Sequence, residues 1–142
     1  MTGSAKSSNW NAAILYACVA AGGVIGSVAR YLASLLIPTI AGFPLPTLLV
    51  NVTGSFIIGF YSTITGPDGR VFASTRQRQF VMTGICGGYT TFSAFSLESF
   101  RLLHGGMTAT ALLNISVSVV TWLVAVWLGH VLASRLNRLK GS

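Results

Sequence analysis

The sequence predicts an all-α integral membrane protein, with one membrane domain over residues 1–142 and four transmembrane helices. Two observations carry this prediction. Hydrophobic residues make up 52% of the chain and charged residues only 8%, whereas soluble domains average about 25% charged residues. Apolar runs also recur four times along the chain, and each is close to the roughly 20 residues that a helix needs to cross a bilayer.

Turn signals separate the four apolar runs. Pro38, Pro44 and Pro46 bracket the first connection, and the sequence GPDG at 66–69 begins the second. The sequence His104–Gly106 marks the third. The predicted spans cover residues 12–37, 45–65, 79–103 and 107–134, and the third of these is predicted to be broken.

The basic residues predict the orientation of the chain in the membrane. Four spans place both termini on one side, and seven of the nine Lys and Arg residues fall on that side, against Arg101 at most on the other. The positive-inside rule therefore predicts cytoplasmic termini. No basic-aromatic surface pattern accompanies the net charge of +7, so no nucleic-acid partner is predicted. The seven residues are Lys6, Arg70, Arg76, Arg78, Arg135, Arg138 and Lys140.

The first span carries small residues and one charge. Gly22 and Gly26 form a GxxxG pattern, which allows close approach of another helix. Arg30 lies four residues after Gly26 and hence on the same helical face. An arginine at this depth either snorkels to the interface as a structural anchor or attracts anions from a vestibule, and the sequence leaves both open.

The second span carries a polar stripe. Thr47, Asn51 and Ser55 recur every four residues and so share one face of the predicted helix. These side chains could link two helices by hydrogen bonds, or could line a pore. The stripe alone favours the first interpretation.

The third span contains the stretch GGYTTFSAFS at 87–96, which is unusually polar for a membrane helix. Two adjacent glycines weaken a helix, and two β-branched threonines follow them, so we expect a break near 87–91. Backbone carbonyls freed there could bind a cation, and a simple kink is the alternative. Phe92 and Phe95 follow at a spacing of three, and their electropositive ring edges could attract an anion. Glu98 is the only acid in or beside a span.

The fourth span carries Asn114, Ser118 and Thr121 at positions i, i+4 and i+7, which predicts a second polar stripe. The chain contains no HExxH, GxSxG, P-loop or Cys/His cluster. Paired carboxylates are also impossible inside the spans. The sequence therefore predicts that the protein is not an enzyme.

Three segments together resemble the Fluc (CrcB-type) fluoride channels. They are GxxxR at 26–30, TLLVNVTGSFIIG at 47–59 and GICGGYTTFSAFSLE at 84–98, and the resemblance extends over about residues 12–130. It implies a fluoride-selective channel in the bacterial inner (plasma) membrane that exports cytoplasmic fluoride. It further implies an antiparallel, dual-topology homodimer of four-helix subunits with two pores and a structural sodium ion at the dimer interface.

The resemblance also implies roles for particular residues. Gly87 and Thr90 would offer backbone carbonyls to sodium. The residues implied in the pore or in fluoride binding are Phe92, Phe95, Asn51, Ser118, Thr47, Thr91, Glu98 and Arg30.

Two features depart from the family pattern. Many members have tyrosine where this chain has Asn114, and the seven-to-one charge bias conflicts with insertion of one chain in both orientations. An oppositely oriented paralogous subunit is therefore an alternative partner. A proton-coupled multidrug-type transporter is a rival function, although it would place an acid in the first span, where this chain has only Arg30. A structural membrane subunit would not explain the clustered polar residues.

Overall fold

The computed structural model describes residues 2–40 and 42–138, and these residues are almost entirely helical. The predicted all-α class is confirmed. The elements in chain order are α1 (Thr2–Leu36), α2 (Leu45–Ile64), α3 (Thr75–Gln79), the π-helix η1 (Phe80–Cys86), α4 (Gly87–Tyr89), α5 (Phe92–His104) and α6 (Thr108–Arg138).

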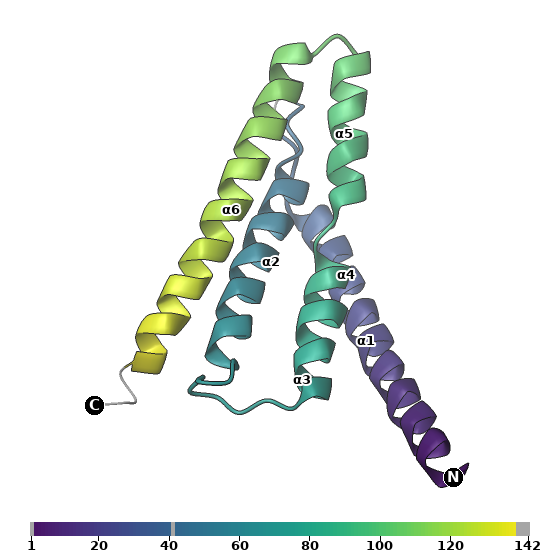
Figure 1. Cartoon of the computed structure of the whole chain (residues 1–142). Coiled ribbons are helices and arrows are strands. Elements are labelled where there is room, and N and C mark those ends of the chain that lie inside the picture. Colours follow the sequence, from purple (N-terminus) through teal and green to yellow (C-terminus); the bar gives the residue numbers. More distant parts are fainter. Residues whose placement is uncertain (1, 41, 139–142) are drawn as a thin grey trace.

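Within residues 2–40 and 42–138, three helices are long and apolar enough to cross a membrane: Trp10–Leu36, Leu45–Ile64 and Thr108–Arg138. The third apolar run consists of shorter helical pieces on either side of a break, so it is not one of these three. A fourth span, made of two half-helices, stays a prediction. Figure 1 shows α4 and α5 following one another along the length of the bundle, with the break between them.

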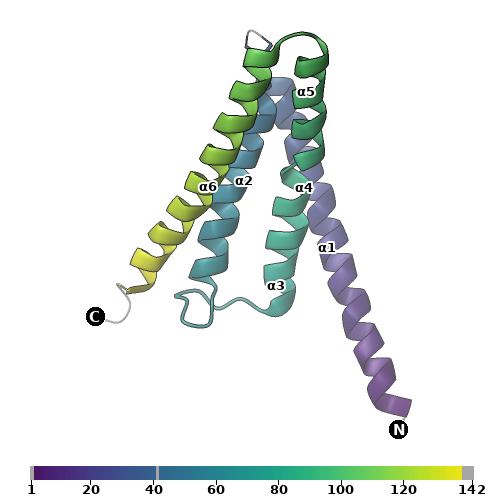
Figure 2. The ribbon, with the colours of Figure 1, turned by 45° about the horizontal axis from the view of Figure 1, so that its top comes forward.

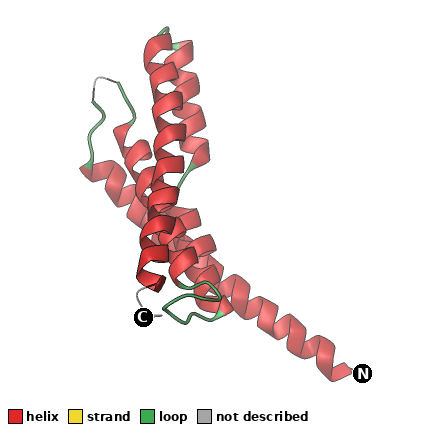
Figure 3. Ribbon diagram, turned by 60° about the vertical axis from the view of Figure 1, so that its left-hand side comes forward, coloured by secondary structure: helices red, strands yellow, loops and turns green. Residues whose placement is uncertain are grey.

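The helices pack in two groups. α2 packs chiefly on α6, while α3, η1 and α4 lie against α1. Figure 1 shows the first residues of α1, the α2–α3 loop and the end of α6 at the same end of the molecule. Arg70, Arg76, Arg78, Arg135 and Arg138 belong to elements at that end. In Figure 3 the N-terminal part of α1 extends beyond the other helices.

Glycines set the closest contacts within both groups. A Cβ on Gly26 would overlap the carbonyl oxygen of Ile85, and a Cβ on Gly129 would overlap that of Phe56. Backbones that approach this closely gain van der Waals contact, which is the main packing force between helices in lipid. The GxxxG pattern in α1 is therefore a packing surface, and the partner that it contacts is the η1–α4 segment of the same chain.

Polar side chains cap helix ends at the arginine-rich end of the molecule, where the α2–α3 loop lies. The guanidinium of Arg78 donates to the carbonyl oxygens of Ser62 and Thr65, near the C-terminus of α2. Ser74 and Gln77 form a capping box at the start of α3. These contacts satisfy backbone groups that a helix end leaves without partners.

Candidate functional site

The helix break lies at Thr90 and Thr91. Their backbones are extended, with φ and ψ of −77° and 158° at Thr90 and −152° and 114° at Thr91. Gly87 and Gly88 are helical, so the glycines lie just before the break and do not form it. The break falls within the predicted 87–91, at its threonine end. Gly88 instead packs on α1, where a Cβ would overlap the carbonyl oxygen of Gly23.

Asn51 bridges the break from the neighbouring helix α2. Its Oδ1 accepts a hydrogen bond of 2.7 Å from the backbone N–H of Thr91, and its Nδ2 donates one of 3.0 Å to the carbonyl oxygen of the same residue. Both partners are buried. The side-chain amide thus takes the place of a neighbouring peptide group, and it satisfies backbone atoms that the break would otherwise leave unpaired. The second N–H of Asn51 is not needed for this bridge.

Thr91 is also the N-cap of α5. Its Oγ1 accepts a 3.1 Å hydrogen bond from the backbone N–H of Ala94. In a continuous helix, the N–H of Thr91 would donate to the carbonyl of Gly87, and the N–H of Ala94 to the carbonyl of Thr90. Both N–H groups here bond to side chains instead. The carbonyls of Gly87 and Thr90 are therefore released from the helical pattern.

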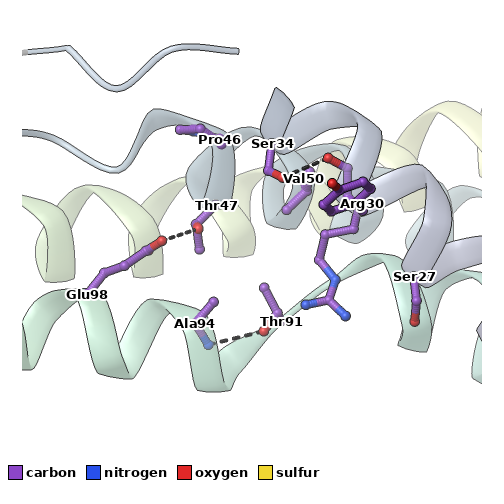
Figure 4. A pocket seen from close by; sticks show the side chains of 10 residues that line it. Ser27, Arg30, Ser34, Pro46, Thr47, Val50, Thr91, Ala94 and Glu98 are labelled. Carbon is purple, nitrogen blue, oxygen red and sulfur yellow. Dashed lines mark hydrogen bonds between the residues drawn. The ribbon is translucent and has the colours of Figure 1, made fainter. Parts of the chain in front are cut away.

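A cavity of about 350 Å³, here called the arginine cavity, lies on one side of Thr91. Figure 4 shows Arg30 from α1, Thr47 from α2 and Glu98 from α5 around it. The Thr47 hydroxyl donates a 2.7 Å hydrogen bond to Oε1 of Glu98. Oε2 of Glu98 is buried and has no hydrogen-bond partner among residues 2–40 and 42–138.

Arg30 has a structural role in the arginine cavity. Its Nε donates a 3.1 Å hydrogen bond to the carbonyl oxygen of Gly88, directly before the break. Its side chain is half-buried. This contact supports Arg30 as a structural anchor for the neighbouring helix, whereas snorkelling to the interface stays a prediction. The guanidinium also lines the cavity, so the interpretation as a vestibule charge stays open.

A second cavity, of about 260 Å³, lies on the other side of Thr91 and is here called the tryptophan cavity. Asn51, Phe92 and Trp122 line it, together with Gly87 and Thr90. Asn51, Phe92 and Trp122 carry no formal charge, and they place an amide, a phenyl ring and an indole around one cavity. Thr91 lines both cavities, so the bridged break is the wall between them.

The two phenylalanines of the motif have different surroundings. Phe92 is 72% exposed and Phe95 only 7% exposed. Their ring centroids are 5.5 Å apart, and Phe95 packs edge-on against Trp122 at 4.9 Å. Phe95 is therefore a core residue of this chain, whereas Phe92 lies on its surface beside the tryptophan cavity.

Two residues of the polar stripe on α6 are deeply buried. Asn114 and Ser118 are each 1% exposed, and Asn114 Nδ2 donates a 2.9 Å hydrogen bond to Ser99 Oγ on α5. The Thr121 hydroxyl instead donates to the carbonyl oxygen of Val117 in its own helix. Its place in the stripe therefore stays a prediction from spacing. The sequence interpretation also missed Trp122, although its spacing of four from Ser118 placed it on the same face.

The structure brings the predicted residues together around the break. Thr91, Asn51, Gly87, Thr90 and Phe92 meet at the tryptophan cavity or its wall. Arg30, Thr47 and Glu98 gather on the other side of Thr91. Ser118 and Phe95 line neither cavity within the described part of the chain. Phe95 packs on Trp122 of α6, and the buried Ser118 hydroxyl donates to Oδ1 of Asn114 on its own helix.

This arrangement defines a class of protein: a multi-pass helical membrane protein whose polar side chains gather at a broken helix inside the bundle. The family model described as "CrcB-like protein, Camphor Resistance (CrcB)" matches residues 17–130. The chain therefore belongs to the CrcB-like, or Fluc, family, as its three sequence segments indicated.

Relatives with similar sequences cover nearly the whole chain. The chain is 64% identical over 133 residues to the "Fluoride-specific ion channel FluC 1" of Bradyrhizobium diazoefficiens, with 94% of each chain covered. It is 66% identical over 132 residues to the protein of that name from Rhodopseudomonas palustris, covering 92% of this chain and 94% of the relative. It is 52% identical over 130 residues to the "Fluoride-specific ion channel FluC" of Opitutus terrae, covering 90% and 98%.

Proposed function

We propose that this chain is the subunit of a fluoride-selective channel that lets cytoplasmic fluoride leave the cell passively and so relieves fluoride toxicity. One observation carries the proposal: a broken helix, bridged by Asn51, separates two cavities lined by polar and aromatic side chains. It occurs in a chain that is 64% identical to a protein named a fluoride-specific channel. Those names describe channels, which agrees with the expectation that the protein is not an enzyme.

The chemistry at the break suits a small, strongly hydrated anion. Such an ion leaves water only if hydrogen-bond donors replace its hydration shell. The second N–H of Asn51 and the electropositive ring edge of Phe92 supply neutral attraction beside the tryptophan cavity. A neutral lining attracts the ion without holding it as firmly as a fixed positive charge would. Arg30, in the other cavity, would raise the local concentration of anions.

A dimer would complete the pore. Phe92 and Gly87 are exposed at the level of the break, where the chain alone would present a break and two cavities to lipid. Irregular backbone at membrane depth is tolerated only where protein or a water-filled cavity covers it. An antiparallel second copy, giving two pores in a bacterial inner membrane, would provide that cover.

The released carbonyls fit a sodium ion at such an interface. Gly87 and Thr90 have lost the N–H partners that a continuous helix would give them. Unwound backbone carbonyls are typical sodium ligands in membrane proteins. Two carbonyls are too few for one ion, so both copies would contribute. We expect thermal unfolding in detergent to occur at higher temperature in sodium chloride than in potassium chloride. Equal unfolding temperatures in the two salts would contradict the sodium site.

The proposed function is tested by fluoride efflux from liposomes that contain only this purified chain, measured with a fluoride electrode. We expect fast fluoride efflux without chloride efflux. Asn51→Asp should abolish it, because a carboxylate replaces the N–H donor and repels the anion. Paired Phe92→Ile and Phe95→Ile substitutions should abolish it too, because they remove the ring edges.

Two outcomes would point to the alternatives. A well-folded chain that conducts no fluoride by itself would contradict the homodimer, and it would favour an oppositely oriented paralogous subunit as partner. The distribution of the described arginines toward one end makes this partner the main alternative. Transport that requires a pH gradient would instead favour the proton-coupled multidrug-type transporter, with Glu98 as its proton carrier.

A further inference from the structure

Trp122 carries a hydrogen-bond donor that the described structure does not use. Its Nε1 atom is buried and has no hydrogen-bond partner among residues 2–40 and 42–138. An indole nitrogen is a donor only, so it needs an acceptor. A buried donor without an acceptor is destabilising, and such donors are rare in packed interiors.

The position of Trp122 connects this donor with the candidate site. Trp122 lies four residues after Ser118 and eight after Asn114, so the three side chains share one face of α6. Its ring lines the tryptophan cavity together with Asn51 and Phe92. It also packs edge-on against Phe95, with ring centroids 4.9 Å apart.

We propose that the indole N–H of Trp122 is a further hydrogen-bond donor to the permeating anion, on the same pathway as Asn51 and the two phenylalanines. This inference rests on the proposed function. The N–H is covered in the described structure, so the ion would meet it after a small movement of the Phe92 or Trp122 ring. Both rings line the tryptophan cavity, whose volume of about 260 Å³ leaves space for that movement.

A neutral indole suits this task. It offers one strong donor without a formal charge, so it can replace a water molecule around the ion and still release it. An anion that accepts this N–H would satisfy the unpaired donor, which favours its entry. The competing possibility is an N–H contact with the face of an aromatic ring such as that of Phe95, which would make Trp122 purely a packing residue.

The first test compares fluoride efflux rates of two phenylalanine variants in liposomes. Trp122→Phe keeps an aromatic ring and removes the N–H, and we expect fluoride efflux to fall about tenfold, as the loss of one hydrogen bond of ordinary strength predicts. Trp127→Phe is the matched control, because Trp127 lies on the same helix and is 60% exposed. It should keep the wild-type rate. Equal rates for Trp122→Phe and wild type would overturn this inference while leaving the proposed function intact.

The second test uses the wild-type chain and does not depend on the folding of a variant. The indole N–H signals of protein labelled with ¹⁵N-tryptophan are recorded in detergent micelles during titration with sodium fluoride, with sodium chloride as control. We expect the Trp122 indole proton to move downfield with fluoride only, while the Trp10 and Trp127 signals stay in place. An unmoved Trp122 signal, in a preparation that conducts fluoride in liposomes, would assign the N–H to packing. A wild-type chain that conducts no fluoride would contradict the proposed function and this inference together.

Discussion

The two halves of the third apolar run are held by different kinds of contact. Figure 2 shows α3 and α4 before the break and α5 after it. Before the break, η1 and α4 lie directly against α1 because glycines leave the backbones bare at the contact. After the break, α5 is held by particular side chains on α2 and α6. The glycines of the first contact are Gly22, Gly26, Gly84 and Gly88. The side-chain contacts of the second are Phe95 with Trp122, Ser99 with Asn114, and Glu98 with Thr47.

The two kinds of contact give the segments before and after the break different roles. Backbone-to-backbone packing leaves little freedom, so the first half can hold the carbonyls of Gly87 and Thr90 in a constant position. The second half carries hydroxyl and aromatic side chains beside cavities, where small rotations are possible. Asn51 joins the halves, since its two hydrogen bonds fix the extended residue from which α5 starts.

The largest loss of stability is expected when a side chain is added at the backbone contact between α1 and the η1–α4 segment. In Gly26→Ala, the new methyl group would overlap the Ile85 carbonyl oxygen and lie 2.7 Å from the amide nitrogen of Tyr89. Neither atom can move without shifting a helix, so the cost should exceed the roughly 1–3 kcal/mol of an ordinary overpacked site. We expect little folded protein to be recovered, as judged by size-exclusion chromatography and thermal unfolding in detergent.

Gly23→Ala is the matched control on the same helix. A Cβ at Gly23 meets no atom within 4 Å. Alanine is also the better helix former by about 1 kcal/mol. The variant should therefore be as stable as the wild type or slightly more stable. If both alanine variants unfold alike, direct backbone packing does not hold the first half in place.

An intermediate loss of stability is expected when Asn51, which joins the two halves, is replaced. Asn51→Leu keeps the branched shape of the side chain but leaves the buried N–H and C=O of Thr91 without their partner. Unpaired buried groups of this kind should lower the free energy of unfolding by about 2–3 kcal/mol. Asn51→Asp retains the acceptor for the Thr91 N–H but turns a buried carboxylate oxygen toward the Thr91 carbonyl oxygen, so it should lose stability and also abolish fluoride efflux. Thermal unfolding measured beside efflux would separate the two effects, and an Asn51→Leu variant as stable as wild type would show that the bridge does not hold the break.

The sequence predicts the helices and the position of the break better than it predicts the contacts between polar side chains. Apolar run lengths indicate the long helices, and two β-branched threonines after two glycines indicate a break near 87–91. Weak helix propensity made Gly87 and Gly88 natural candidates for the break itself. Both are helical, because tertiary contact with α1 overrides intrinsic propensity and the glycines are used for close approach.

The contacts that form the site are harder to predict. A spacing of four residues placed Thr47 and Asn51 on one helical face, but it could not show that their partners are Glu98 and Thr91. Those partners are 51 and 40 residues away along the chain. Spacing also could not show that the Thr121 hydroxyl bonds to its own helix, or that the Trp122 N–H has no partner among the residues that the structure describes.

The smallest loss of stability is expected when the N-cap of α5 is removed. Thr91→Val keeps the β-branched shape but removes the Oγ1 that accepts the Ala94 N–H. Loss of an N-cap of this kind costs about 1 kcal/mol. Thr91→Ser keeps the hydroxyl and should unfold close to the wild-type temperature, so the pair isolates the cap from the packing of the side chain. Because Asn51 bonds only to the backbone of Thr91, the bridge should survive in both variants, and Thr91→Val should lose less stability than Asn51→Leu. A larger loss in Thr91→Val would mean that the cap of α5, and not the Asn51 bridge, holds the two halves in register.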